Sequence, residues 1–259
     1  MLGAIVGDIV GSRFEYNNIK RKDFQFLSKE CFVTDDTILT LAVCDALLKN
    51  TEDLNRAATE SLRAFSRRYA DKDYGDGFRR WMLIDNAQPY GSFGNGAAMR
   101  VSPCSIAAQT LQEAKMMSDA VTSPTHNHPE GLKGAQATAV AGFLAKTGLN
   151  KQEIENYINQ HYYPMNFTLE EIRATYRYEG SCQQTVPFAL KAFFESDAFE
   201  DAIRNAVSIG GDSDTLAAIT GGVAAIYYGV DSWIEEKALT FLDDYQKEVI
   251  VQVEKRFKV

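Results

Sequence analysis

Residues 34–43 of this chain read TDDTILTLAV, and residues 212–219 read DSDTLAAI. In each stretch two aspartates stand just before a strongly apolar run, as they do where a helix begins, because the free N–H groups and the dipole of a helix N-terminus favour negative charge. Aspartate and threonine are also ordinary N-cap residues, so either stretch alone could be no more than a cap. Together, two helices too apolar for the surface predict four carboxylates that converge near the core.

Such a cluster needs a positively charged partner, because a charge that is buried alone is very costly. The chain has no paired Cys or His ligands, and ligand sets made only of oxygen select Mg²⁺, Mn²⁺ or Ca²⁺ over zinc. The two acidic stretches therefore predict the half-sites of one dinuclear centre for hard cations, with Thr34 and Thr215 offering hydroxyl oxygens.

Helical patterns recur along the chain and alternating strand patterns are nearly absent, which predicts an all-α fold. Four helix starts show capping-box spacing: they are Thr110 with Glu113, Asn150 with Glu153, Thr168 with Glu171, and Ser232 with Glu235. Glycines at positions 3, 7 and 11 share one stripe of the first expected helix, which indicates close packing rather than a nucleotide loop, and Asp8 in the same segment is expected to be buried.

The 259 residues suit one large domain or two small ones, and because no low-complexity linker divides them we expect a single domain over residues 1–259. A net charge of −8, with no basic run beyond residues 20–22, argues against a stable nucleic-acid partner. Four scattered cysteines, no basic leader and no apolar run of membrane-spanning length predict reduced thiols in a cytoplasmic protein without membrane attachment. Nothing indicates a protein partner, and we expect a monomer.

Two loops carry residues suited to a ligand. Residues 91–96, GSFGNG, contain three glycines, so their N–H groups could cradle a pyrophosphate, although a tight turn between helices explains them equally well. His126 and His128 lie in a proline-bounded loop and suit neutral hydrogen bonding or stacking near a ligand better than metal ligation.

Glu15, at the end of the first segment, has two interpretations of equal weight. Near a metal pair, its carboxylate could order a water or contact a ribose hydroxyl. Alternatively, it forms a surface salt bridge with Arg13 or Lys20.

Five stretches, taken in order and spacing, resemble the ADP-ribosylglycohydrolase family over nearly the whole chain. They are GDIVGSRFE at 7–15, TDDT at 34–37, GNGAAMR at 94–100, TH at 125–126, and GGDSDT at 210–215. The resemblance implies a compact single-domain orthogonal bundle of helices with two divalent cations, Mg²⁺ before Mn²⁺, at the floor of a cleft. It implies six metal ligands, which are Thr34, Asp35, Asp36, Asp212, Asp214 and Thr215.

The same resemblance makes Gly94, Asn95, Gly96 and His126 candidates for holding ADP-ribose. It places Glu15, as a mobile carboxylate, and the aspartates at 35 and 36 at the scissile side as candidate catalytic residues.

The implied function is hydrolysis of the bond between C1″ of ADP-ribose and an acceptor. Bound metals would orient the ribose and position a water, while carboxylates stabilise the positive charge that develops at C1″. Residues 71–89 look like a short form of the family's acceptor side, so arginine, serine, a nucleic-acid base and O-acetyl-ADP-ribose all stay open as acceptors.

Two alternatives are a non-catalytic protein that binds ADP-ribose or a nucleotide, and a metal-dependent phosphohydrolase. The products distinguish them, because only the phosphohydrolase would release AMP and ribose 5-phosphate. The residue that stacks on adenine is also open among Phe93, Tyr90 and Tyr74.

Overall fold

The computed structural model describes residues 1–49 and 52–258, and the regular elements in this part of the chain are α-helices and short 3-10 turns joined by loops. The one extended pairing among these residues is a single antiparallel bridge between Gly94 and Ser181. The prediction of an all-α fold is therefore confirmed.

The helices α1 to α7 span Leu2–Gly11, Asp35–Leu48, Leu54–Arg68, Asp76–Leu83, Ser102–Ala107, Leu111–Thr122 and Pro129–Lys146. The helices α8 to α14 span Lys151–His161, Leu169–Arg173, Cys182–Phe194, Phe199–Ser208, Ser213–Tyr228, Ser232–Leu239 and Asp244–Phe257. The two 3-10 turns are η1, Ser12–Phe14, and η2, Asn95–Ala97.

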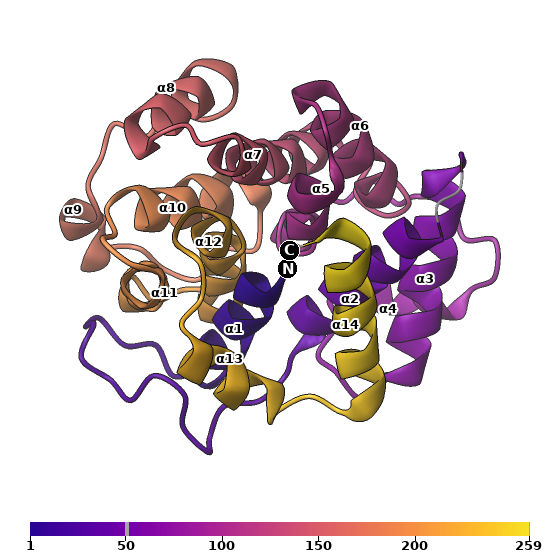
Figure 1. Ribbon diagram of the computed structural model, residues 1–259, viewed down its shortest axis with the longest axis horizontal. Coiled ribbons are helices and arrows are strands. Elements are labelled where there is room, and N and C mark those ends of the chain that lie inside the picture. Colours follow the sequence, from indigo (N-terminus) through magenta and orange to yellow (C-terminus); the bar gives the residue numbers. More distant parts are fainter. Residues whose placement is uncertain (50–51, 259) are drawn as a thin grey trace.

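Helices α1 and α12 lie side by side at the centre of the molecule (Figure 1). Helices α7, α10 and α11 pack against α12, while α2 packs against α1 and carries α3 and α14 on its other faces. The first three turns of α12, from Ser213 to Ala224, are buried on every side. A helix that is apolar all round belongs in the core, so the central position of α12 follows from its composition.

The backbones of α1 and α12 touch along the predicted glycine stripe. A Cβ atom added to Gly7 would lie 2.0 Å from the carbonyl oxygen of Ala217, and one added to Gly11 would lie 2.5 Å from Cα of Asp214. No side chain fits at either position, so the predicted close packing is confirmed. The contact brings the end of α1 directly against the second acidic stretch.

The helix starts agree with the sequence at two of the four expected capping boxes, those that begin at Asn150 and Thr168. At α6, the Glu113 carboxylate accepts from the N–H of Gln109 instead of the N-cap residue. The prediction for α13 is wrong, because Asp231 rather than the serine after it occupies the N-cap position. Aspartate caps as well as serine does, so spacing alone could not choose between these neighbours.

All four cysteines are free and buried. Burial raises the pKa of Cys44 and of Cys182 to about 12, which keeps both as unreactive thiols. Among the described residues, none of the helices has both the length and the apolar character that a membrane crossing requires.

Candidate metal centre and its cleft

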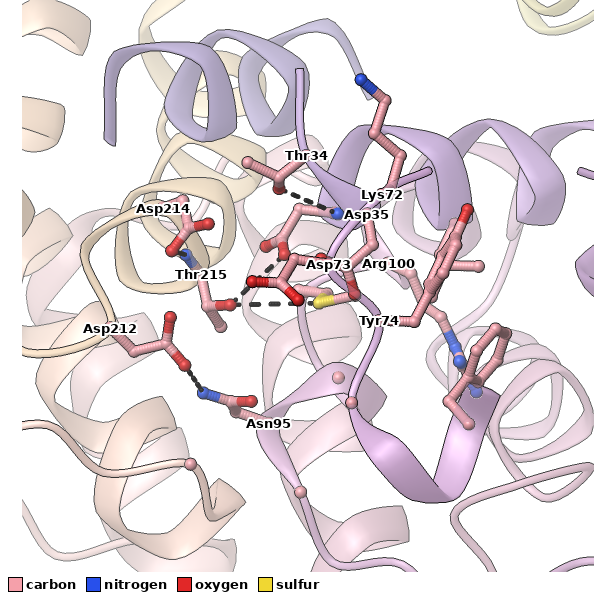
Figure 2. A pocket seen from close by; sticks show the side chains of 18 of the residues that line it. Thr34, Asp35, Lys72, Asp73, Tyr74, Asn95, Arg100, Asp212, Asp214 and Thr215 are labelled. Carbon is pink, nitrogen blue, oxygen red and sulfur yellow. Dashed lines mark hydrogen bonds between the residues drawn. The ribbon is translucent and has the colours of Figure 1, made fainter. Parts of the chain in front are cut away.

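A cleft of about 980 Å³ opens over the starts of α2 and α12. Its lining also includes η1, the glycine loop before η2 and residues 71–78. Figure 2 shows Asp212, Asp214 and Thr215 on one side and Asp35 on the other, turned toward the space between them. The two acidic stretches, 175 or more residues apart in the chain, thus form one floor.

Asp8 of α1 holds the first of these stretches in place. Its carboxylate accepts hydrogen bonds from the backbone N–H groups of Thr34 and Thr37, each at 3.1 Å, and from both hydroxyls, with Thr34 Oγ1 at 2.6 Å. Burial raises the pKa of Asp8, and these four donors oppose that rise. Because the Thr34 hydroxyl donates to Asp8, its oxygen faces other groups as an acceptor.

The two stretches also touch each other. The Thr215 hydroxyl donates to Asp36 Oδ2 at 3.3 Å, and Asp214 Oδ1 accepts from the N–H of Thr215 at 3.0 Å. Carboxylate oxygens of Asp212, Asp214 and Glu15 all lie within 4.8 Å of one another. All six residues that the resemblance implies as metal ligands line the same cleft, and Glu15 lines it with them.

The carboxylates of this cluster are buried beside one another. Burial first, and neighbouring carboxylates second, raise the pKa values of Asp35, Asp36 and Asp214 well above the ordinary value. No salt bridge in the described part of the chain reaches any carboxylate of the cluster. Asp36 Oδ1 is buried without any hydrogen-bond partner. An oxygen-only cluster with an open buried carboxylate oxygen fits hard divalent cations.

Glu15 lies at the cluster and not in either of the salt bridges considered for it. Arg13 pairs with Glu30 at 3.0 Å, and Lys20 donates to the carbonyl oxygen of Tyr176 at 2.8 Å. Burial and the nearby charge of Asp212 raise the pKa of Glu15 to about 7. This carboxyl group is therefore poised to hold or release a proton near neutral pH.

Asn95 supports the second acidic stretch. Its side-chain Nδ2 donates to Asp212 Oδ2 at 2.7 Å, and its backbone N–H donates to the carbonyl oxygen of Gly180 at 2.8 Å. The family resemblance implies that Asn95 lies beside the ligand, but the sequence does not predict its hydrogen bond to Asp212. The glycine loop is thus a turn pinned against residues 180–181, and it also lines the cleft.

The two neighbouring histidines have different places. His128 is the N-cap of α7, where its Nδ1 accepts from the N–H of Glu130 at 3.1 Å. His126 is buried and lines the cleft, with Nδ1 2.7 Å from Thr125 Oγ1. Burial, aided by the charge of Arg100, lowers the pKa of His126 well below its ordinary value, so the ring is neutral.

Aromatic and acidic residues form the rim. Three aromatic residues are candidates for stacking on adenine. Tyr90 and Phe93 are 38% and 47% exposed, so a ligand can reach both rings, whereas Tyr74 is only 2% exposed. On another side, the segment 71–76 contributes three aspartates and one lysine to the lining. The Tyr16 hydroxyl donates to Asp73 Oδ2 at 2.9 Å and ties this segment to the residue after Glu15.

Comparison with known proteins identifies the family of this chain. The model of the family described as ADP-ribosylglycohydrolase matches residues 1–258. The ADP-ribosyl-[dinitrogen reductase] glycohydrolase of Rhodospirillum rubrum is 30% identical over 258 residues, which cover 89% of this chain and 84% of that protein. The human ADP-ribosylhydrolase ARH3 is 25% identical, with coverage of 89% and 85%.

Two further matches bear on length and fold. The ADP-ribosylarginine hydrolase Tri1 of Serratia proteamaculans is 29% identical over 157 residues, and the match spans 55% of this chain and 42% of that longer protein. A solved structure titled ADP-ribosylglycohydrolase-related protein complex superposes with a TM-score of 0.72 at 22% identity, over 99% of this chain and 96% of its own. This last match shows a shared fold.

Proposed function

The chain belongs to the ADP-ribosylglycohydrolase family and is an enzyme that hydrolyses ADP-ribose linkages; we propose that it does so with two divalent cations held in the cleft. The observation that carries this proposal is the buried cluster of carboxylates, which forms no ion pair within the described part of the chain and has one carboxylate oxygen without a hydrogen-bond partner. Such a cluster is unfavourable unless positive charge is supplied to it.

The ligands proposed for the cations are the hydroxyl oxygens of Thr34 and Thr215 and four carboxylates, those of Asp35, Asp36, Asp212 and Asp214. When bound, two Mg²⁺ ions would supply a Lewis acid and a template for the ribose hydroxyls and the attacking water. Asn95 fixes the orientation of Asp212, and Asp8 fixes the threonine hydroxyls of the first stretch. These bonds pre-organise the oxygens before any cation arrives.

The chain's own residues then serve the reacting sugar. As the bond at C1″ breaks, positive charge develops on the ribose, and the carboxylates of Asp35 and Asp36 at the floor of the cleft stabilise it. Glu15 faces the same space, where its carboxylate could order the water or contact a ribose hydroxyl. Gly94, Gly96 and His126 line the remainder of the proposed ADP-ribose site.

For the acceptor we propose a cationic group, of which arginine is the natural case. Three aspartates of residues 71–76 line one side of the cleft against a single lysine, so the potential there is negative. A guanidinium attached to ADP-ribose keeps its positive charge and would be attracted to this side. An uncharged acceptor, such as a serine joined through an O-glycosidic bond or an acetyl ester, gains nothing from it.

The test is a release assay with Mg²⁺ that offers arginine-linked, serine-linked and base-linked ADP-ribose and O-acetyl-ADP-ribose in parallel. The products are identified by mass spectrometry. Free ADP-ribose, released fastest from the arginine linkage, is the expected result. AMP with ribose 5-phosphate would instead reveal a phosphohydrolase. Cation-dependent binding of ADP-ribose without release from any acceptor would reveal a non-catalytic binding protein.

Cation removal should make stability depend on pH in an unusual direction. The folded-state pKa of Glu15 is about 7 against an ordinary 4.5, and the buried aspartates shift in the same direction. A folded state that binds more protons than the unfolded one is stabilised below the unfolded pKa, and this stabilisation is lost as pH rises through the folded pKa. The chelated protein should therefore melt at a lower temperature at pH 8 than at pH 6.

Thermal melting with EDTA and with excess Mg²⁺, each across this pH range, checks the expectation. Added Mg²⁺ should raise the melting temperature most at the alkaline end, because it binds the deprotonated carboxylates of the native state. A melting temperature that changes with neither EDTA nor Mg²⁺ would exclude a metal centre.

A further inference from the structure

Arg100 is an unusual residue beside the cleft because its side chain is fully buried. Its Nη2 donates to Thr125 Oγ1 at 2.8 Å and lies at 3.4 and 3.5 Å from the carbonyl oxygens of Val121 and Thr122, while Nε and Nη1 have no partner. Burial lowers its pKa only to about 10, so the guanidinium stays charged at neutral pH. Of the three contacts of this charged group, the one to Thr125 is the shortest and is its best hydrogen bond.

That bond limits what the Thr125 hydroxyl can do. A hydroxyl has one proton, and the oxygen of Thr125 already accepts from Arg100. Its proton can go to the carbonyl oxygen of Thr122 at 3.5 Å or to Nδ1 of His126 at 2.7 Å. If Nδ1–H instead donated to the Thr125 oxygen, the hydroxyl proton would have only the 3.5 Å contact with Thr122, at the limit of a hydrogen bond. Donation from the hydroxyl to Nδ1 is the arrangement that gives the hydroxyl proton a good bond.

A neutral imidazole whose Nδ1 accepts must carry its proton on Nε2. Nε2 of His126 faces the glycine turn, since Cβ atoms added to Gly94 and Gly96 would lie 3.6 and 3.5 Å from it. No hydrogen bond of Nε2 occurs within the described part of the chain, and both glycines and His126 line the cleft. The ring thus presents an open N–H donor beside the backbone of the turn.

We propose that Thr125, held by Arg100, is a positioning residue that keeps His126 as the neutral tautomer with its proton on Nε2, a fixed donor to the phosphate oxygens of the bound ADP-ribosyl group. The identity of this ligand rests on the proposed function, whereas the tautomer does not. A neutral donor suits an anion that must also leave, because it binds without adding a full charge.

The tautomer can be measured directly in the ligand-free protein. Long-range ¹H–¹⁵N correlation spectra separate protonated from unprotonated ring nitrogens, and loss of one of the three histidine patterns in a His126→Gln variant assigns the signals. We expect one protonated nitrogen, Nε2, and an Nδ1 that accepts a hydrogen bond. A proton on Nδ1, or on both nitrogens at neutral pH, would overturn the proposal before any ligand is added.

Two substitutions of Thr125 test its role. Thr125→Val keeps the shape but removes the hydroxyl, so the Nδ1 signal should move to that of a nitrogen without a hydrogen bond, and binding of ADP-ribose should weaken roughly tenfold. Thr125→Ser retains the hydroxyl and should preserve both the signal and the affinity. An unchanged Nδ1 signal in Thr125→Val would show that another group orients His126.

These results separate the inference from the proposed function. If the wild type shows the expected tautomer and binds no ADP-ribose, the proposed ligand is wrong. The proposed bond from Nε2 of His126 to its phosphate oxygens is then wrong as well. If it binds ADP-ribose and Thr125→Val binds it equally well, the ligand stands and the positioning role of Thr125 fails. Melting curves of the valine and serine variants control for a loss of fold.

Discussion

Replacing Asp36 with asparagine should lower the rate of ADP-ribose release about a thousandfold and yet make the cation-free protein more stable. The loss of rate follows if Asp36 is a ligand, because a neutral amide holds Mg²⁺ far less strongly than a carboxylate does. The gain in stability follows because burial and the charges of Asp35 and Asp8 disfavour the Asp36 carboxylate, which must either stay charged or take up a proton at neutral pH, whereas an amide is neutral without one. A residue that only supported the fold would change both quantities in the same direction.

The measurements are single-turnover release with Mg²⁺ and urea denaturation with EDTA and with Mg²⁺. Wild type should gain stability from Mg²⁺, since a ligand of the native state alone stabilises it, and Asp36→Asn should gain little. Activity close to that of wild type would remove Asp36 from the proposed centre.

A matched control lies on the same helix. Asp45 of α2 accepts from Ser61 at 2.6 Å and pairs with Lys49 at 3.2 Å, outside the cleft. Asp45→Asn removes one charge from the same element, so release should stay within about twofold of wild type while stability falls slightly. An equal loss of activity in both variants would point to damage of α2 rather than loss of a ligand.

The acidic stretches and the glycine stripe were readable from the sequence because each is a local pattern with a physical cause. Carboxylates before an apolar run predict helix starts, and glycines four apart predict a helix face without side chains. The partners of these groups could not be read, since they depend on how distant segments meet. Asp8 was expected to be buried, but its bonds to Thr34 and Thr37 follow only from the packing of α1 on α2.

Glu15 illustrates the same limit. Its neighbours in sequence, Arg13 and Lys20, offered salt bridges that distance along the chain could not exclude. Arg13 instead pairs with Glu30, which leaves Glu15 beside Asp212 and Asp214. Only the approach of α12 to the end of α1 decides between the two interpretations.

The largest expected loss of stability comes from Gly7→Ala. The added Cβ would lie 2.0 Å from the carbonyl oxygen of Ala217 and 2.4 Å from its carbon, and neither backbone atom can move without moving α12. Alanine is more favourable than glycine in a helix by about 1 kcal/mol. The clash lowers the free energy of unfolding only if its cost exceeds this gain. We expect the free energy of unfolding to fall by about 3 kcal/mol in urea denaturation.

Gly180→Ala is the matched control, because an added Cβ there meets nothing within 4 Å. Its free energy of unfolding should stay within about 0.5 kcal/mol of wild type. A Gly7→Ala protein as stable as this control would show that the two central helices can separate at little cost.

The same substitution also tests how the fold builds the site. Helix α1 holds the first acidic stretch through Asp8 and lies against the second through Gly11, so it sets the distance between the two halves of the cluster. Pushing α12 away from α1 should therefore weaken Mg²⁺-dependent stabilisation and slow ADP-ribose release in the molecules that still fold. Full activity per folded molecule would mean that the half-sites keep their spacing by contacts of α2 with α12 alone, such as that between Thr215 and Asp36.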